Sequence, residues 1–392
     1  MEYSIEFKNV DILFGRKKGR AISMLDNSSD RETILKETGV VLGVADVNLG
    51  IYRDEIFVLM GLSGSGKSTL LRCINGLNPV TRGKLHIRYG AETINMAEAS
   101  ENQLRELRLN HFSMVFQQFG LLPWATVREN VSFGLRIKKV PPKQIKETVE
   151  EKLALVQLSD WADKPISSLS GGMQQRVGLA RALAMDSEIL LMDEPFSALD
   201  PLIREHLQDE LLDIQKKLKK TIVFVSHDLN EALKLGDRIA IMKEGKIVQT
   251  GVAHDIVFNP INEYVEKFVS NINPLTSLYA GALMKPVDAA SQHEVIVGDG
   301  LTLRLDELGT PASFSADGKE LPLSTELSSA SESNVTLIDF EVPMFEIIEP
   351  VRNSPYPLIV TKNGKLIGVL DESCIFKGLK LKHSSSPVDF LG

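Results

Sequence analysis

The sequence predicts an α/β fold for residues 1–270, and three observations support this prediction. Short, mostly apolar runs at residues 56–60, 189–192 and 221–226 have the length of strands that are buried on both faces. Segments with apolar residues three and four positions apart, which is helical spacing, separate these runs. Buried strands that alternate with helices are typical of a parallel sheet covered by helices.

The helices between these strands are predicted from apolar spacing and from start signals. Ser100 and Gln103 form a capping box before the apolar pair Leu104 and Leu107. Two further helices are predicted from apolar positions: Ile145, Val149, Leu153 and Val156 after Pro142, and Leu207, Leu211, Ile214 and Leu218.

The pattern changes at residue 271, where strand-like pieces such as residues 294–297 begin to alternate with polar stretches. Asn363-Gly364, between apolar runs at 357–360 and 366–370, is a strong hairpin signal. We predict a linker at 271–274, a loop at 324–334 and a frayed end at 383–392. The chain is thus predicted to have two domains, residues 1–270 and a smaller α+β domain at 271–392.

The composition excludes a disordered, a collagenous and a coiled-coil chain. Of the 392 residues, 43% are hydrophobic and 24% are charged, which is typical of globular chains. We expect no membrane span and no signal peptide, and with only two distant cysteines we expect a reducing compartment. Residues 271–392 carry 9 Lys and Arg against 16 Asp and Glu, within a net charge of −8 for the whole chain. Neither part has the basic excess of a nucleic-acid binder.

A phosphate-binding loop is predicted at residues 61–68, which read Gly-Leu-Ser-Gly-Ser-Gly-Lys-Ser between a buried strand and a helix that we expect from Thr69 onward. The glycines allow backbone N–H groups to converge on phosphates, and the helix adds its positive end. Lys67 would reach the β- and γ-phosphates, and the Ser68 hydroxyl would bind Mg²⁺. The predicted nucleotide-binding residues here are Gly61, Leu62, Ser63, Gly64, Ser65, Gly66, Lys67, Ser68 and Thr69. The alternative is a simple glycine-rich turn.

Two adjacent carboxylates end the predicted strand at 189–192. Asp193 would hold Mg²⁺ through water, and Glu194 would polarise an attacking water molecule. The alternative is an ordinary strand end with solvated acidic side chains.

Residues 169–176 resemble the signature sequence of ATP-binding cassette (ABC) ATPases. They read Leu-Ser-Gly-Gly-Met-Gln-Gln-Arg. Four other residues stand in that family's motifs and order: the Q-loop Gln117, the D-loop Asp200, the switch His227 and the adenine-stacking Phe14. The resemblance covers residues 5–270. It implies a RecA-like P-loop NTPase core with a helical subdomain at about residues 118–168. Taken alone, His227 could be a structural histidine and Phe14 a core aromatic.

The resemblance also implies ATP hydrolysis and its residues. Glu194, His227 and Gln117 would be catalytic, and Mg²⁺ would be held by Ser68, Gln117 and Asp193. A helix that begins after Ser170 offers a second anion site through its free N–H groups. In the family two subunits pack head to tail. The resemblance thus implies a homodimer in which the partner's ATP is contacted by Ser170, Gly171, Gly172, Gln174 and Asp200.

A narrower resemblance concerns the insertion at residues 16–43, with a helix-like segment at 31–38. It is similar to that of osmoprotectant importer ATPases, as are residues 60–66, 196–204 and 236–242. This implies import of glycine betaine, proline betaine, choline or carnitine at the cytoplasmic side of the membrane, with a permease and a substrate-binding protein or domain as partners. Residues 119–124 would form part of the groove for the permease, or else belong to the helical-subdomain core. The alternatives are an importer for another small solute, such as an amino acid, or a soluble ABC ATPase that acts in DNA repair or translation.

In the C-terminal region only the second part resembles a known module. Residues 335–377 resemble one half of a CBS pair, a regulatory module, whereas residues 275–334 match poorly, so we expect a divergent or incomplete pair. The alternative is a small β-rich accessory domain without a ligand. Lys377, Lys380 and Lys382 form a basic cluster, which is either a solvated end or a latch on anionic lipid.

Overall fold

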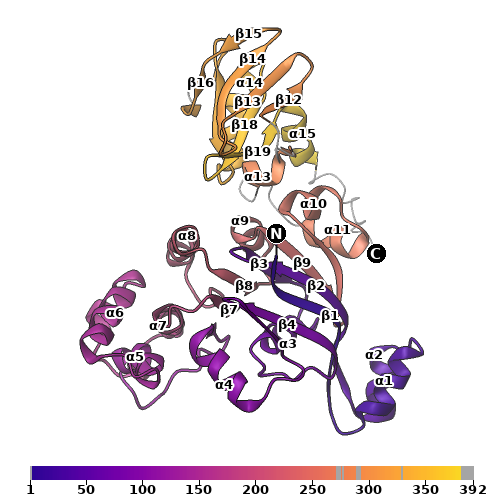
Figure 1. Ribbon diagram of the computed structural model, residues 1–392, viewed down its shortest axis with the longest axis vertical. Coiled ribbons are helices and arrows are strands. Elements are labelled where there is room, and N and C mark those ends of the chain that lie inside the picture. The colour runs from indigo at the N-terminus through magenta and orange to yellow at the C-terminus, as the bar shows by residue number, and fades with distance from the viewer. Residues whose placement is uncertain (1, 271–274, 276–277, 288–292, 328–329, 381–392) are drawn as a thin grey trace, which may run out of the picture. The chain divides into compact units, whose positions relative to one another are not determined.

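The computed structural model describes residues 2–270, 275, 278–287, 293–327 and 330–380. The chain divides into two compact units (Figure 1). One unit comprises Met1–His227 and Asp237–Thr250, and the other comprises Asp228–Gly236 and Gly251–Gly392. The predicted linker at 271–274 and the predicted frayed end at 383–392 lie outside the described residues.

The core of the first unit is a six-stranded sheet with the order β10-β9-β3-β8-β7-β6. Neighbouring strands from β9 to β6 pair in parallel. The three strands predicted from apolar runs are β3, β7 and β8, and every residue in them is buried. The strand bounds are β3 (Ile56–Met60), β6 (Phe112–Val115), β7 (Ile189–Asp193), β8 (Thr221–Val225), β9 (Arg238–Lys243) and β10 (Lys246–Gly251). The α/β prediction is confirmed.

A second sheet, with the order β2-β1-β4-β5, is antiparallel and shares its core with the first. Its strands are β1 (Tyr3–Phe14), β2 (Val41–Tyr52), β4 (Arg82–Tyr89) and β5 (Glu92–Asn95). The insertion between β1 and β2 forms two helices, α1 (Lys18–Asp26) and the predicted α2 (Arg31–Thr38). The sequence did not predict α1, which has no side-chain cap and buries only Ala21.

The helices predicted from spacing around Leu104, Val149 and Leu207 are present, whereas the sequence did not predict the helix at 127–137. Ser100 and Gln103 form the predicted capping box of α4, and Pro142 starts α6. Helices α5, α6 and α7 pack against one another, so the helical region extends beyond residue 168. The bounds are α3 (Lys67–Ile74), α4 (Glu101–Asn110), α5 (Val127–Ile137), α6 (Pro142–Leu155), η1 (Ser159–Trp161), η2 (Ile166–Ser168), α7 (Gly171–Ala184) and α8 (Pro201–Leu218).

The second unit contains short helices and two small sheets. Its helices are α9 (Leu229–Leu235), α10 (Ala253–Phe258), α11 (Glu263–Val269), α13 (Ala280–Leu283), α14 (Met344–Asn353) and α15 (Glu372–Lys380). One sheet has the order β11-β19-β18-β17-β16, and the other, β12-β13-β14-β15, is antiparallel. The strands are β11 (Lys285–Pro286), β12 (Glu294–Gly298), β13 (Leu301–Leu305), β14 (Pro311–Ala316), β15 (Lys319–Leu321), β16 (Leu323–Ser324), β17 (Val335–Asp339), β18 (Leu358–Lys362) and β19 (Lys365–Leu370).

Two predictions for this unit can be compared with the structure. The hairpin at Asn363-Gly364 is confirmed, because β18 and β19 pair antiparallel and both turn residues have positive φ, 53° and 77°. Ser324, the first residue of the predicted loop, ends strand β16, and residues 328–329 of that loop lie outside the described residues. Within the described residues, no helix has both the length and the apolar composition that crossing a membrane requires.

Candidate nucleotide site

The glycine-rich loop connects β3 to α3 and has the backbone that the sequence predicts. Gly61, Gly64 and Gly66 have φ values of 146°, 76° and 102°, which side chains with a Cβ rarely adopt. A Cβ on Gly61 would lie 2.3 Å from the Met242 carbonyl oxygen. On Gly66 it would lie 2.6 Å from the Gly43 carbonyl oxygen. The loop therefore requires glycine at both positions.

Two polar side chains in this loop, Lys67 and Ser65, are buried. Lys67 has no salt-bridge partner among the described residues. Lys67 is 6% exposed, and its Nζ donates to the carbonyl oxygens of Gly61 (2.8 Å) and Leu62 (3.0 Å). Burial lowers the pKa of Lys67, and the nearby carboxylates of Glu194 and Asp193 oppose this shift. The buried Ser65 Oγ has no hydrogen-bond partner in the described part of the chain. A buried cation and an unsatisfied hydroxyl in one loop are suited to bind an anionic ligand.

Asp193 links the strand β7 to the start of α3. Its side chain is fully buried and accepts hydrogen bonds from Ser68 Oγ (2.8 Å) and Arg72 Nη2 (2.9 Å). The predicted proximity of Ser68 and Asp193 is therefore present, although the two residues are far apart in sequence. The sequence analysis did not identify Arg72, which lies one helical turn after Ser68 and neutralises the buried carboxylate.

Glu194, Gln117 and His227 converge, as the motif order predicts. Gln117 Nε2 donates to Glu194 Oε2 at 3.4 Å, and His227 Nδ1 lies 3.4 Å from the same oxygen. Glu194 follows β7 directly and has a positive φ of 51°, which is a strained backbone for a residue with a side chain. Two side chains, those of Gln117 and His227, therefore contact the Glu194 carboxylate at the carboxyl ends of the parallel strands.

Gln175 holds the backbone of Glu194, and the sequence analysis did not identify it. Gln175 is 1% exposed. Its Nε2 donates to the Glu194 carbonyl oxygen (3.0 Å), and its Oε1 accepts from the Ala198 N–H (3.0 Å). The sequence does indicate that Gln175 is buried, because Leu179 and Ala182 lie four and seven residues after it and thus on the same helix face.

Phe14 and the outer residues of the phosphate-binding loop are exposed. Phe14 ends β1 with 38% exposure. A Cβ on Gly43 would lie 2.8 Å from the Phe14 ring and 3.0 Å from Thr69 Cγ2, so Gly43 is flanked by the ring and by the start of α3. Leu62 is 62% exposed, and Ser63 is exposed.

The signature residues lie at the start of α7. Ser170 is its N-cap and accepts from the Met173 N–H at 3.3 Å. Gly171 is exposed, and a Cβ on Gly172 would lie 2.9 Å from the Ala198 carbonyl oxygen. Gln174 Nε2 donates to the Leu169 carbonyl oxygen at 3.1 Å.

Asp200 caps α8 and accepts from the Ile203 N–H at 3.1 Å. Each of the two predicted partner-contacting motifs thus contains an exposed helix N-cap, Ser170 in one and Asp200 in the other.

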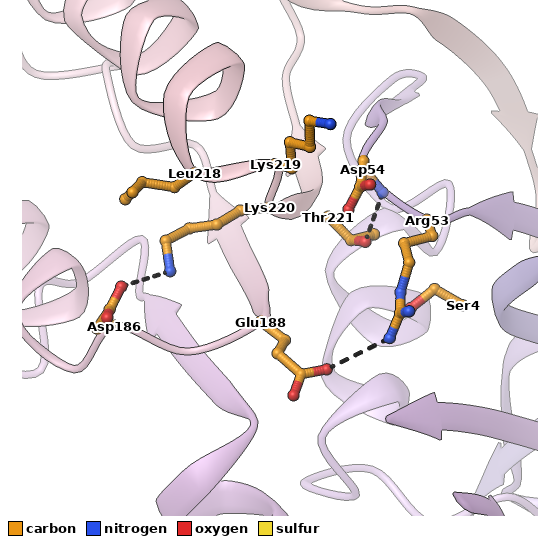
Figure 2. A pocket seen from close by; sticks show the side chains of 9 residues that line it. All are labelled: Ser4, Arg53, Asp54, Asp186, Glu188, Leu218, Lys219, Lys220 and Thr221. Carbon is orange, nitrogen blue, oxygen red and sulfur yellow. Dashed lines mark hydrogen bonds and ion pairs between the residues drawn. The ribbon is translucent and has the colours of Figure 1, made fainter. Parts of the chain in front are cut away.

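A cavity of about 390 Å³ lies at the opposite, amino ends of the same parallel strands (Figure 2). Charged side chains line it, and several of these charges are paired: Lys220 with Asp186 at 2.8 Å, and Arg53 with Glu188 at 3.8 Å. The Asp54 N–H also donates to Thr221 Oγ1 at 3.1 Å. Because cations and carboxylates alternate around this cavity and pair with each other, its charge does not select a ligand of one sign.

Comparisons with known proteins agree with this geometry. Residues 44–197 match the family described as ABC transporter. The chain is 40% identical over 391 residues to the glycine betaine/carnitine transport ATP-binding protein GbuA of Listeria monocytogenes, covering 96% of this chain and 97% of that protein. It is 42% identical to the glycine betaine transport ATP-binding protein OpuAA of Bacillus subtilis, covering 96% and 90%.

A solved structure extends the comparison to the fold. The dimeric, post-hydrolysis structure of the ATP-binding cassette MJ0796 with ADP and Pi is 31% identical, with a TM-score of 0.55, and covers 63% of this chain and 98% of that one. The phosphate cradle, which is the loop at residues 61–68, and the contacts at Glu194 both indicate ATP hydrolysis. Relatives that match over almost the whole chain are ATP-binding transport proteins. The chain therefore belongs to the ATP-binding subunits of ABC importers, in the group of the glycine betaine and proline betaine transport proteins, and it is an ATPase that powers transport.

Proposed function

We propose that this chain hydrolyses MgATP to drive the import of a quaternary amine osmoprotectant, with glycine betaine as the first candidate. The observation that carries this proposal is the match to two betaine-transport subunits over 96% of the chain, which includes the insertion and the C-terminal region. The protein would act at the cytoplasmic face of the membrane, bound to a permease that works with a substrate-binding protein or domain.

The residues of the site suit phosphoryl transfer to water. The cradle and Lys67 hold the triphosphate, and Phe14 stacks on the adenine. Glu194 orients the attacking water, while Gln117 and His227 hold the Glu194 carboxylate and face the γ-phosphate. Phosphoryl transfer depends on positioning and electrostatics, and these groups supply both.

The site also fits Mg²⁺. Ser68 Oγ and Asp193 Oδ1 are hard oxygen ligands that lie 2.8 Å apart, and Gln117 supplies an amide. Among the described residues, no group of three His, Cys, Asp or Glu side chains could hold a metal alone. This agrees with Mg²⁺, which binds through one or two side chains, water and substrate phosphates. When bound, it would neutralise charge on the phosphate oxygens.

We further propose that two copies pack head to tail, so that Ser170 and the glycines after it complete the partner's site. The exposed N-caps at Ser170 and Asp200 support this arrangement, as does the dimeric MJ0796 structure, to which the chain is similar.

Ser170→Arg is expected to leave ATP binding by the monomer intact and to weaken ATP-driven dimerisation by about 5–150-fold, since overpacking costs about 1–3 kcal/mol. Light scattering with excess MgATP measures the dimer. Ser159→Arg, at another exposed serine of the helical region, is the control and should dimerise normally. Loss of nucleotide binding by the Ser170→Arg monomer would instead assign Ser170 to its own chain's pocket.

The permease would dock at a mostly apolar groove between the core and the helical region. A cavity of about 380 Å³ there is lined by residues that include Phe116, Phe133, Ile137 and Met185. Arg181 donates to the carbonyl oxygens of residues 119 and 120, which fixes the loop beside the cavity. Figure 1 shows α5, α6 and α7 grouped on one side of the core sheet, and the loop leads into α5.

Trp124, in this loop, is 81% exposed. Trp124→Ser is therefore expected to weaken binding to the permease about 30-fold, the size of an interface hot spot of about 2 kcal/mol. Co-purification with the permease in detergent measures this effect. Trp161→Ser removes the other tryptophan of the chain and is the matched control. Equal retention of both variants would exclude this loop from the interface.

For the C-terminal region we propose a divergent CBS-like regulatory domain. The segment predicted to resemble one half contains β17, α14, β18, β19 and α15 in that order. The preceding part contains instead the antiparallel sheet β12-β13-β14-β15. Of the basic cluster, Lys377 lies exposed on α15, whereas Lys382 lies outside the described residues.

Transport by the reconstituted complex tests the proposed substrate. Vesicles that contain this chain, its permease and the substrate-binding partner should take up glycine betaine when they hold MgATP, and other quaternary amines should compete. Uptake of an amino acid without competition by any quaternary amine would overturn the proposal.

A further inference from the structure

The inserted helices α1 and α2 are packed firmly onto the nucleotide-binding unit. Ala21 and Ile34 are fully buried in a small apolar cluster with Leu13 and Leu42 from the strands on either side of the insertion. Asp26, at the end of α1, accepts from Arg82 Nη1 on β4 at 2.6 Å. The insertion is therefore a fixed part of this unit, and side chains on it have defined positions.

One of these side chains reaches the phosphate loop. Arg31, the first residue of α2, donates from Nη1 to the Gly64 carbonyl oxygen at 2.8 Å. The next peptide N–H, that of Ser65, donates to the Leu62 carbonyl oxygen at 3.1 Å. Because a peptide unit is planar, these two bonds hold both ends of the Gly64–Ser65 peptide and fix the outer turn of the loop.

The guanidinium of Arg31 has N–H donors that this hydrogen bond does not use. Among the described residues its side chain makes no other hydrogen bond or ion pair, and guanidinium carries five N–H donors. Positive charge at the edge of a phosphate cradle attracts a polyanion. By contrast Arg20, also in the insertion, is paired with Glu37 at 3.0 Å.

We propose that Arg31 is a nucleotide-positioning residue, which fixes the phosphate loop through Gly64 and adds positive charge beside the triphosphate. The insertion would then belong to the ATP site, in addition to linking two strands. This inference rests on ATP binding at the cradle, and it does not depend on which solute is imported.

Three variants of the full chain test this proposal by calorimetric titration with MgATP. Arg31→Ala removes both the hydrogen bond and the charge, and we expect about fivefold to tenfold weaker binding. Arg31→Gln keeps a donor for the Gly64 carbonyl but removes the charge, so we expect an intermediate affinity. Arg20→Gln is the matched control and should bind as wild type does.

Salt separates the two contributions. The Debye length falls from about 10 Å at 0.1 M to about 3 Å at 1 M, so wild type and Arg31→Gln should converge at high salt. Arg31→Ala should stay weaker at both salt concentrations. A merely structural role would give no such salt dependence.

Two results would contradict the proposal. If wild type binds MgATP and Arg31→Ala binds equally well, Arg31 has no part in the site. If wild type itself does not bind MgATP, the cradle assignment fails and this inference fails with it.

Discussion

Glu194→Gln is expected to lower ATP turnover by about 10²-fold or more while MgATP binding persists, because the amide keeps the shape but loses the negative charge that orients and polarises water. The structure favours Glu194 for this role. Its carboxylate is the one on which Gln117 and His227 converge, both at 3.4 Å.

The backbone at Glu194 adds to this argument. Its positive φ is held by Gln175, which binds the Glu194 carbonyl, and by the Glu194 N–H, which donates to the Val225 carbonyl oxygen at 3.1 Å. A strained residue that is held by its surroundings is typical of functional sites. The strain lies in the backbone, so the change to glutamine should leave it in place and act on chemistry alone.

Phosphate release under excess MgATP measures the turnover, and calorimetry measures binding. Glu188→Gln is the matched control, since Glu188 is a carboxylate at the opposite end of the same strand. We expect its turnover to equal that of wild type. Turnover of Glu194→Gln within twofold of wild type would remove Glu194 from the mechanism.

The parts of the fold that depend on local sequence could be predicted. The strands β3, β7 and β8 are apolar throughout, and the turn at Asn363-Gly364 has a backbone preference of its own. Gly61, Gly64 and Gly66 of the phosphate loop all have positive φ, a local backbone preference for glycine that the sequence pattern reflects.

Contacts between distant segments could not be predicted. Arg31 meets Gly64 across 33 positions, and Arg72 meets Asp193 across 121. An arginine is not unusual in a helix. Only the packing of the insertion and of α3 brings Arg31 and Arg72 to their partners. The spacing of Gln175 from Leu179 and Ala182 indicates a buried helix face, but its contact with the Glu194 carbonyl, 19 positions away, depends on tertiary packing.

Lys67→Ala is expected to weaken MgATP binding by about 10–150-fold, since a charge-assisted hydrogen bond in a partly dry site contributes about 1.5–3 kcal/mol. The Lys67 ammonium is buried and held by the Gly61 and Leu62 carbonyl oxygens, so it is already positioned at the cradle before a ligand arrives. Little side-chain entropy then remains to be lost on binding.

The electrostatics of the site point in the same direction. Burial lowers the pKa of Lys67, which means that its charged form lacks solvation, and the carboxylates of Glu194 and Asp193 compensate in part. A triphosphate brings more negative charge and should stabilise the ammonium further. Calorimetric titration with MgATP measures the loss, and Lys84→Ala, at an exposed lysine of β4, is the control. Unchanged affinity of Lys67→Ala would show that the loop does not bind phosphate through this cation. Equal losses of affinity in Lys67→Ala and Lys84→Ala would indicate a general effect of net charge and not a contact in the cradle.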